Sequence, residues 1–101
     1  MGEKKKKMIT YRELLERIAE KYGLYARPSW DGDMDIIMPY DEKYSELRKE
    51  LEKFGFIIKS KVSSDRLFRE WHIHSPHRQG LLGPRGWENT LEYNKPRVIG
   101  G

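Results

Sequence analysis

Two stretches of the chain carry apolar residues at the three- to four-residue spacing of an amphipathic helix. The first stripe is Tyr11, Leu14, Leu15, Ile18 and Tyr22, and the second is Tyr44, Leu47, Leu51 and Phe54. Thr10 and Glu13 form a capping box before the first stripe, and Asp41 is an N-cap before the second. Gly23 and Gly55 follow the two stripes and are expected to end the helices as C′ residues. The pattern therefore predicts two helices of three to four turns each.

Three shorter stretches have the two-residue alternation of β-strands. They are residues 34–38, 56–62 and 66–74, and Ser63-Ser64-Asp65 forms a hairpin turn between the last two. In the first stretch Met34, Ile36 and Met38 should face the core and leave Asp35 and Ile37 on the other side, because alternate side chains leave a strand on the same side. The same rule turns Trp71 and Ile73 towards the core.

This order of elements predicts an α+β domain: an N-terminal helix followed by a βαββ unit, which is a partial ferredoxin-like arrangement. A right-handed crossover and a hairpin give a three-stranded antiparallel sheet with strand 66–74 in the middle and both helices on one face. Residues 24–32 are expected to be a connector. We expect a basic disordered tail at 1–8, the folded domain at 9–77, and an irregular Gly/Pro-rich segment at 78–101 that is partly docked. Within that segment, residues 87–95 fit either two helical turns or an irregular strap.

Composition limits the cellular environment and the kinds of site that we expect for this protein. Charged residues make up 36% of the 101 residues, and there is no cysteine, which excludes disulfides and thiolate metal sites. Abundant Lys and Glu with little Asn or Gln is typical of thermophilic proteins. No apolar run approaches the roughly 20 residues of a membrane helix. We therefore expect a cytoplasmic protein without a membrane partner, such as a small archaeal or viral accessory protein.

Positive charge is concentrated at the two ends of the chain. Residues 11–75 hold 12 basic and 13 acidic residues, whereas residues 1–10 hold four Lys and one Glu. An open sheet face with aromatic and basic side chains is typical of proteins that stack single-stranded bases. The predicted nucleic-acid-binding residues are Lys59, Lys61, Phe68, His72, His74, Arg78 and Arg85. This favours a non-enzymatic protein that binds RNA, DNA or a nucleoprotein complex, although Lys59 and Lys61 fit equally well as charges that protect an edge strand from pairing.

A second hypothesis is a metal site on strand 66–74. His72 and His74 leave the same face of that strand, so both imidazoles can reach one divalent cation. Glu70 shares this face and His77 follows shortly after, so either side chain could complete the set of ligands. The alternative metal ligands are therefore Glu70, His72, His74 and His77, with a divalent metal as the cofactor.

The motif His72-Ile73-His74 resembles the His-hydrophobic-His strand of the HUH endonuclease superfamily. The resemblance covers about ten residues in a similar βαββ context. It implies a metal-dependent phosphodiesterase in which the two histidines hold a divalent metal that polarises a phosphate. It also implies that a downstream tyrosine, here Tyr93, attacks that phosphate. The chain departs from the family pattern after Tyr93, because Asn94-Lys95-Pro96 replaces the usual helical Tyr-x-x-Lys.

Two further features of the sequence bear on function. Asp31, Asp33 and Asp35 alternate like the start of a calcium-binding loop, but Ile36 occupies the position where such a loop needs glycine. We therefore interpret them as a polar turn that leads into a strand.

The apolar residues of segment 78–101 also suggest a third function, a protein-interaction module such as an inhibitor or assembly factor.

Overall fold

Both predicted helices are present in the computed structural model, which describes residues 7–80 and 82–93. Helix α1 (Tyr11–Lys21) begins after Thr10, whose hydroxyl accepts the Glu13 N–H at 3.1 Å. Asp41 caps a single 3₁₀ turn, η1 (Glu42–Tyr44), which continues directly into α2 (Ser45–Lys53). The two capping residues therefore start the helices as the sequence predicts.

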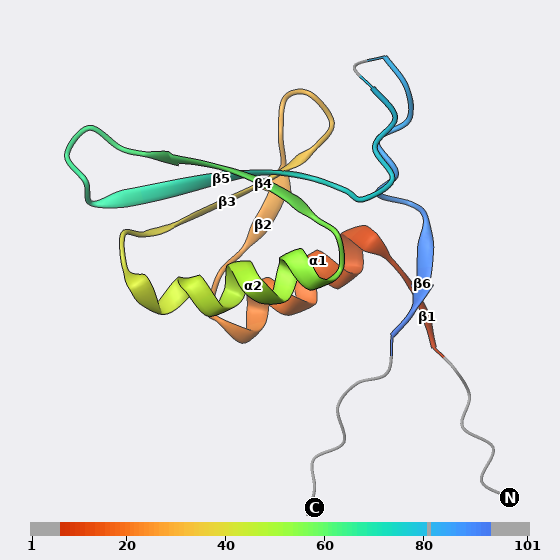
Figure 1. Ribbon diagram of the computed structural model, residues 1–101, viewed down its shortest axis with the longest axis horizontal. Coiled ribbons are helices and arrows are strands. Elements are labelled where there is room, and N and C mark those ends of the chain that lie inside the picture. Colours follow the sequence, from red (N-terminus) through yellow and green to blue (C-terminus); the bar gives the residue numbers. More distant parts are fainter. Residues whose placement is uncertain (1–6, 81, 94–101) are drawn as a thin grey trace, which may run out of the picture.

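A four-stranded antiparallel sheet lies against the two helices in the order β2-β3-β5-β4 (Figure 1). The three predicted strands are β3 (Met34–Pro39), β4 (Ile57–Val62) and β5 (Phe68–His74). β5 lies between β3 and β4, and both helices cover the same face of the sheet (Figure 1). The result is a small α+β domain with two helices and antiparallel sheets.

Three short strands were not predicted. β2 (Ala26–Pro28) pairs with β3 inside the expected connector, so the main sheet has four strands rather than three. β1 (Met8–Thr10) precedes α1 and pairs with β6 (Thr90–Glu92) in a separate two-stranded ribbon. The N-terminal element is therefore a strand, and the possible helix at 87–95 is wrong where the structure describes it. Each of these strands has three residues, too few to show alternation, and its backbone hydrogen bonds go to a partner strand.

The hairpin between β4 and β5 is longer than predicted. Arg66 has a left-handed φ of 59°, and the Asp65 carboxylate accepts the Leu67 N–H at 3.0 Å. These local bonds hold the chain in a turn. β5 therefore begins at Phe68 rather than at Arg66.

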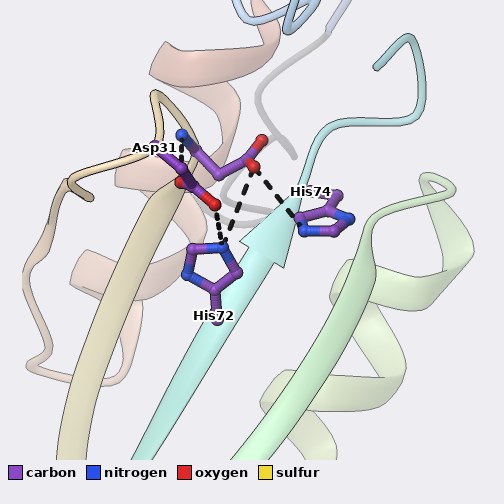
Figure 2. Close-up of side chains that lie close together, drawn as sticks. Asp31, His72 and His74 are labelled. Carbon is purple, nitrogen blue, oxygen red and sulfur yellow. Dashed lines mark hydrogen bonds and ion pairs between the residues drawn. The ribbon is translucent and has the colours of Figure 1, made fainter. Parts of the chain in front are cut away.

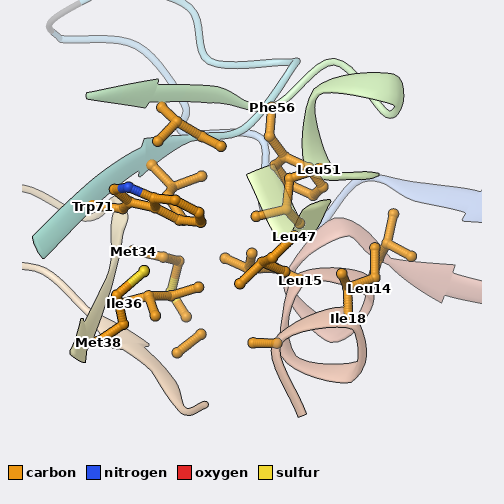
Figure 3. Close-up of a cluster of buried hydrophobic side chains, with 14 of the residues drawn as sticks. Leu14, Leu15, Ile18, Met34, Ile36, Met38, Leu47, Leu51, Phe56 and Trp71 are labelled. Atoms are coloured by element: carbon orange, nitrogen blue, oxygen red, sulfur yellow. The ribbon is translucent and has the colours of Figure 1, made fainter. Parts of the chain in front are cut away.

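The hydrophobic core fills the space between the sheet and the helices (Figure 3). Trp71, one of its two tryptophans, is fully buried together with Ile73 on the helix side of β5. Leu14 and Leu51, one from each helix, are also fully buried. The core faces of β3 and β5 thus follow the predicted alternation, which leaves the even-numbered side chains of β5 on the open face.

The segment after β5 returns to the N-terminal end of α1. Trp87 is only 2% exposed and belongs to the core, and its carbonyl accepts the Arg12 N–H at 3.1 Å. Residues 1–6, 81 and 94–101, which include most of the predicted basic tail and the end of the C-terminal segment, lie outside the described residues. In the described part of the chain, no helix is both long and apolar enough to cross a membrane.

Candidate metal centre

β5 presents its two histidines on the face opposite the helices, as the alternation predicts (Figure 2). The His72 side chain is 24% exposed and the His74 side chain 12% exposed, so both rings are largely covered but reachable. The two rings meet edge to face, with their centroids 5.3 Å apart. They lie at the end of β5 that faces the β2–β3 loop.

That loop, residues 29–33, carries two carboxylates to the histidines. The Ser29 N–H donates to the Asp33 carbonyl at 2.7 Å and closes the loop, and the Asp31 carboxylate accepts the Asp33 N–H at 3.0 Å. Gly32 has a left-handed φ of 90°, a conformation that glycine adopts without steric cost. Asp31 and Asp33 consequently both reach the imidazoles.

Four side chains converge at this point: Asp31, Asp33, His72 and His74. One ligand atom from each lies within 4.8 Å of all the others. Asp31 Oδ2 is 2.8 Å from His72 Nε2, and Asp33 Oδ2 is 3.5 Å from His74 Nε2. Two imidazoles and two carboxylates form a ligand set that suits Mn²⁺, Fe²⁺, Co²⁺ or Zn²⁺.

Asp33 is the most unusual member of the cluster. It is fully buried, and its Oδ1 has no hydrogen-bond partner among the described residues. A buried carboxylate oxygen without a partner is costly, because burial removes its water without replacement. A cation bound to this carboxylate would offset that cost. The unpartnered oxygen of Asp33 therefore supports a metal site independently of the convergence of the four side chains.

A fifth side chain, Asp35 of β3, orients His72. Its Oδ1 lies 2.7 Å from His72 Nδ1, with Ser29 Oγ at 3.4 Å from the same nitrogen. When Nδ1 carries a proton and donates it to Asp35, Nε2 is left with a lone pair directed at the cluster. Such a carboxylate–imidazole pair is the usual support of a metal-ligating histidine.

The cluster pushes the pKa values of its two histidines apart. Burial lowers the pKa of His72, but hydrogen bonds to Asp35 and Asp31 outweigh it and leave this pKa above its ordinary value. Burial lowers the pKa of His74, Asp33 opposes that effect, and Arg78 reinforces it, so this pKa is below its ordinary value. Of the two imidazoles, His74 therefore loses its proton at the lower pH.

Two arginines and a lysine surround the cluster. Arg78 Nε donates to Asp33 Oδ2 at 3.0 Å, and Arg85 Nε donates to the Asp31 carbonyl at 2.8 Å. Lys59 is the β4 residue directly opposite His72. A shallow open pocket next to the cluster is lined by Trp30, Asp31, Lys59, Glu70, His72, His74 and Arg78.

Several predicted site residues are not in the cluster. Glu70 lines the pocket but is not one of the four converging side chains. The ring of His77 packs against Tyr11 of α1, at a centroid distance of 4.9 Å. Tyr93 directly follows β6, and its ring lies 6.3 Å from that of Phe54, just after α2. The structure thus brings neither His77 nor Tyr93 to the two histidines.

The predicted nucleic-acid-binding residues fall into three groups. Lys59 and Arg78 line the pocket beside the cluster, whereas Lys61 and Phe68 line a second depression further along the open face. Arg85 also donates to the Gly80 carbonyl at 3.1 Å, so its guanidinium already ties the two loops together. Only Arg85 is therefore committed to internal backbone contacts.

The sequence interpretation missed the carboxylates of the cluster. It treated these aspartates as a polar turn that leads into the strand beginning at Met34, and it placed Asp35 on the open face of the sheet. The available signal was the combination of two predictions: a strand with Asp35 on that face, and a neighbouring strand with His72 on the same face. Asp31 and Asp33 precede the strand, so their direction depends on the loop and could not be predicted in this way.

Comparisons with known proteins add no relative. No family model matches the chain, and neither a curated protein nor a solved structure is significantly similar to it.

Proposed function

We propose that this protein binds single-stranded nucleic acid on the open face of its four-stranded sheet, and that a divalent metal ion held by Asp31, Asp33, His72 and His74 binds one phosphate. The observation that carries the proposal is the convergence of these four side chains at the edge of an open pocket. Four protein ligands would leave two positions for oxygen ligands on a six-coordinate ion such as Mn²⁺. A phosphate oxygen is suited to such a position.

The surroundings of the cluster favour a phosphate as the ligand. Lys59 and Arg78 line the same pocket and supply positive charge beside the metal position. Trp30, at the rim, is 93% exposed, and Phe68, further along the face, is 50% exposed. Exposed aromatic rings stack on bases whatever their sequence, whereas Lys and Arg side chains bind the backbone. An unpaired strand offers both kinds of contact at once.

A second function, hydrolysis of the bound phosphodiester, is favoured by Glu70. A divalent metal held by the four side chains would supply a water of lowered pKa as the nucleophile. Hydrolysis would form a bond between the water oxygen and phosphorus and break the bond to the leaving oxygen, and Glu70 would carry the water proton to that oxygen. Glu70 lines the pocket without belonging to the four ligands, so its carboxylate remains for this proton. In this mechanism the attacking oxygen comes from water rather than from Tyr93.

The metal half of the proposal is tested by titrating Mn²⁺ and Zn²⁺ into the protein by calorimetry. We expect one equivalent to bind, and His72→Gln and His74→Gln each to weaken binding at least about tenfold, because each removes a ligand. The matched control is His77→Gln, which removes the histidine whose ring packs on Tyr11. Absence of binding to the unmodified protein, or equal loss in all three variants, would contradict the metal site.

The nucleic-acid half is tested with labelled single-stranded DNA and RNA in Mn²⁺ and in chelator, at two salt concentrations. Binding should be tighter with Mn²⁺ and should weaken with salt. Lys59→Ala should weaken it severalfold, and Lys53→Ala, an exposed lysine of α2 on the helix side, should not. Failure of both nucleic acids to bind in Mn²⁺ would remove this half while leaving the metal site intact.

A further inference from the structure

Arg78 and a bound metal ion would compete for the same carboxylate, that of Asp33. Its Nε lies 3.0 Å from Asp33 Oδ2, and the same oxygen faces His74 Nε2 at 3.5 Å and His72 Nε2 at 3.8 Å. Because Asp33 is fully buried, its negative charge needs a nearby positive partner. In the metal-free protein the Arg78 guanidinium is that partner.

A metal ion bound by the four side chains would take over this role. It would share the Asp33 carboxylate with a guanidinium only a few ångströms away, and two positive charges at such a distance repel each other strongly inside a protein. Asp33 can neutralise only one unit of charge, and the divalent ion is also held by Asp31 and both histidines. The metal should therefore displace Arg78 from Asp33.

The displaced guanidinium would move into the open pocket that Arg78 already lines. Arg78 already lines the open pocket together with Lys59 and Trp30, and its side chain is only 15% exposed while it is bound to Asp33. Leaving Asp33 moves the guanidinium away from the buried carboxylate and towards the pocket. There it meets the position of a phosphate on the metal, to which a guanidinium can donate two parallel hydrogen bonds.

We propose that Arg78 is an internal counter-ion of Asp33 which the metal displaces, and that the displaced guanidinium then binds the phosphate of the ligand. This inference rests on the proposed function and adds its regulation. Without metal, Arg78 is bound to Asp33, and the pocket lacks two of its phosphate-binding groups, the metal ion and the Arg78 guanidinium. With metal, both become available together, so metal and phosphodiester bind with positive coupling, each raising the affinity for the other.

The first test compares Mn²⁺ affinity in the unmodified protein, Arg78→Gln and Arg17→Gln. Arg17 pairs with Glu13 on α1, so its variant makes the same change in net charge and also removes an ion pair, but far along the chain from the cluster. Arg78→Gln should bind Mn²⁺ about tenfold more tightly than the unmodified protein, because the competitor for Asp33 is gone. Arg17→Gln should not differ from the unmodified protein.

The second test measures the coupling itself. In the unmodified protein, a saturating single-stranded oligonucleotide should tighten Mn²⁺ binding several-fold, and in Arg78→Gln most of this gain should disappear. If the unmodified protein binds Mn²⁺ but Arg78→Gln binds it equally or more weakly, the inference is overturned while the proposed function stands. If the unmodified protein binds no metal, both fall together.

A third measurement needs no variant and covers the case in which Arg78→Gln does not fold. Zn²⁺, which is diamagnetic, is titrated into protein labelled with ¹⁵N, and the Arg78 Nε–H signal is followed by NMR. Loss of the Asp33 hydrogen bond should shift this signal and speed its exchange with water. An unchanged Arg78 signal at saturating Zn²⁺ would show that the ion and the arginine bind Asp33 side by side, which overturns the inference.

Discussion

At the scale of single residues, the cluster combines two imidazoles of opposite character on one strand. Asp35 and Asp31 hold His72 from either side through Nδ1 and Nε2, whereas His74 faces Asp33 at a longer distance. This asymmetry follows from position: His72 lies opposite Asp35 in the β3–β5 register. Its two nitrogens therefore differ: Nδ1 faces Asp35, and Nε2 faces the cluster, where it would be the ligand atom of the proposed metal.

The raised pKa of His72 predicts how the stability of the metal-free protein depends on pH. A histidine whose pKa is higher in the folded state stabilises that state fully below its ordinary pKa of about 6.5, and this stabilisation is lost as the pH rises through the folded pKa. The lowered pKa of His74 changes the stability only at lower pH. Of the two histidines, His72 therefore causes the change in stability above about pH 6.5. The free energy of unfolding, measured with denaturant in chelator, should therefore fall as the pH rises through this window.

Asp35→Asn provides the control for this pH dependence. It removes the carboxylate whose hydrogen bond is the strongest of the interactions that raise the pKa of His72. The remaining charges that face His72 are Asp31, Asp33, His74 and Lys59. The decline in stability should become shallower in this variant, and an unchanged slope would mean that other groups cause it.

At the scale of elements, the site depends on two loops that the sheet brings together. The β2–β3 loop carries Asp31 and Asp33, and the segment after β5 carries Arg78 and Arg85. Arg85 joins the two loops by donating to the Asp31 carbonyl. The second loop is in turn held against the end of β5 by Ser75, a buried residue whose hydroxyl donates to the Arg85 carbonyl at 2.7 Å.

Gly86 should be essential for this second loop. Its φ is +82°, and a Cβ at this position would lie 2.6 Å from both the Ser75 Oγ and the His77 Cβ. Gly86→Ala combines left-handed strain with overpacking and should lower the free energy of unfolding by about 3 kcal/mol. The matched control is Gly80→Ala, with a φ of +66° and nothing within 4 Å, which should cost only about 1 kcal/mol. Denaturant unfolding checks both, and equal losses would contradict the contact argument.

Elements differ in how far they could be predicted. Both helices were predicted because local signals agree: Thr10 and Asp41 cap them, and their apolar stripes have the right period. β3 and β5 were predicted because alternation over six or seven residues is itself a local signal. β1, β2 and β6 have three residues each, and what makes them strands is a partner elsewhere in the chain.

At the scale of the whole molecule, metal binding should stabilise the folded state and raise the Tm. The four ligands come from the β2–β3 loop and from β5, which lie about forty residues apart in the chain, so the unfolded chain cannot hold them together. A ligand at 100 times its dissociation constant stabilises the folded state by about 2.7 kcal/mol. For a chain of this size that corresponds to a rise in Tm of roughly 10–20 °C.

Thermal unfolding in Mn²⁺ and in chelator measures this rise. In His74→Gln, which lacks one ligand, the same metal concentration should produce a much smaller increase in Tm. An identical increase in both proteins would mean that the metal stabilises the fold at some other place.

The sequence by itself determined the two helices, the long strands and the face on which each of their side chains lies. These depend on periodicity and capping, which act between residues a few positions apart. That is why the placement of His72 and His74 together on the open face could be predicted, and why Asp35 was placed on that face too.

Only the tertiary structure decided that Asp31 and Asp33 meet those histidines, that Arg78 closes on Asp33, and that His77 and Tyr93 lie elsewhere. These contacts depend on the order of the strands and on the paths of two loops. Both are set by the packing of the described helices and strands on the core that contains Trp71, because the direction of a loop depends on where the strands that it joins lie. No pattern along the sequence encodes that direction.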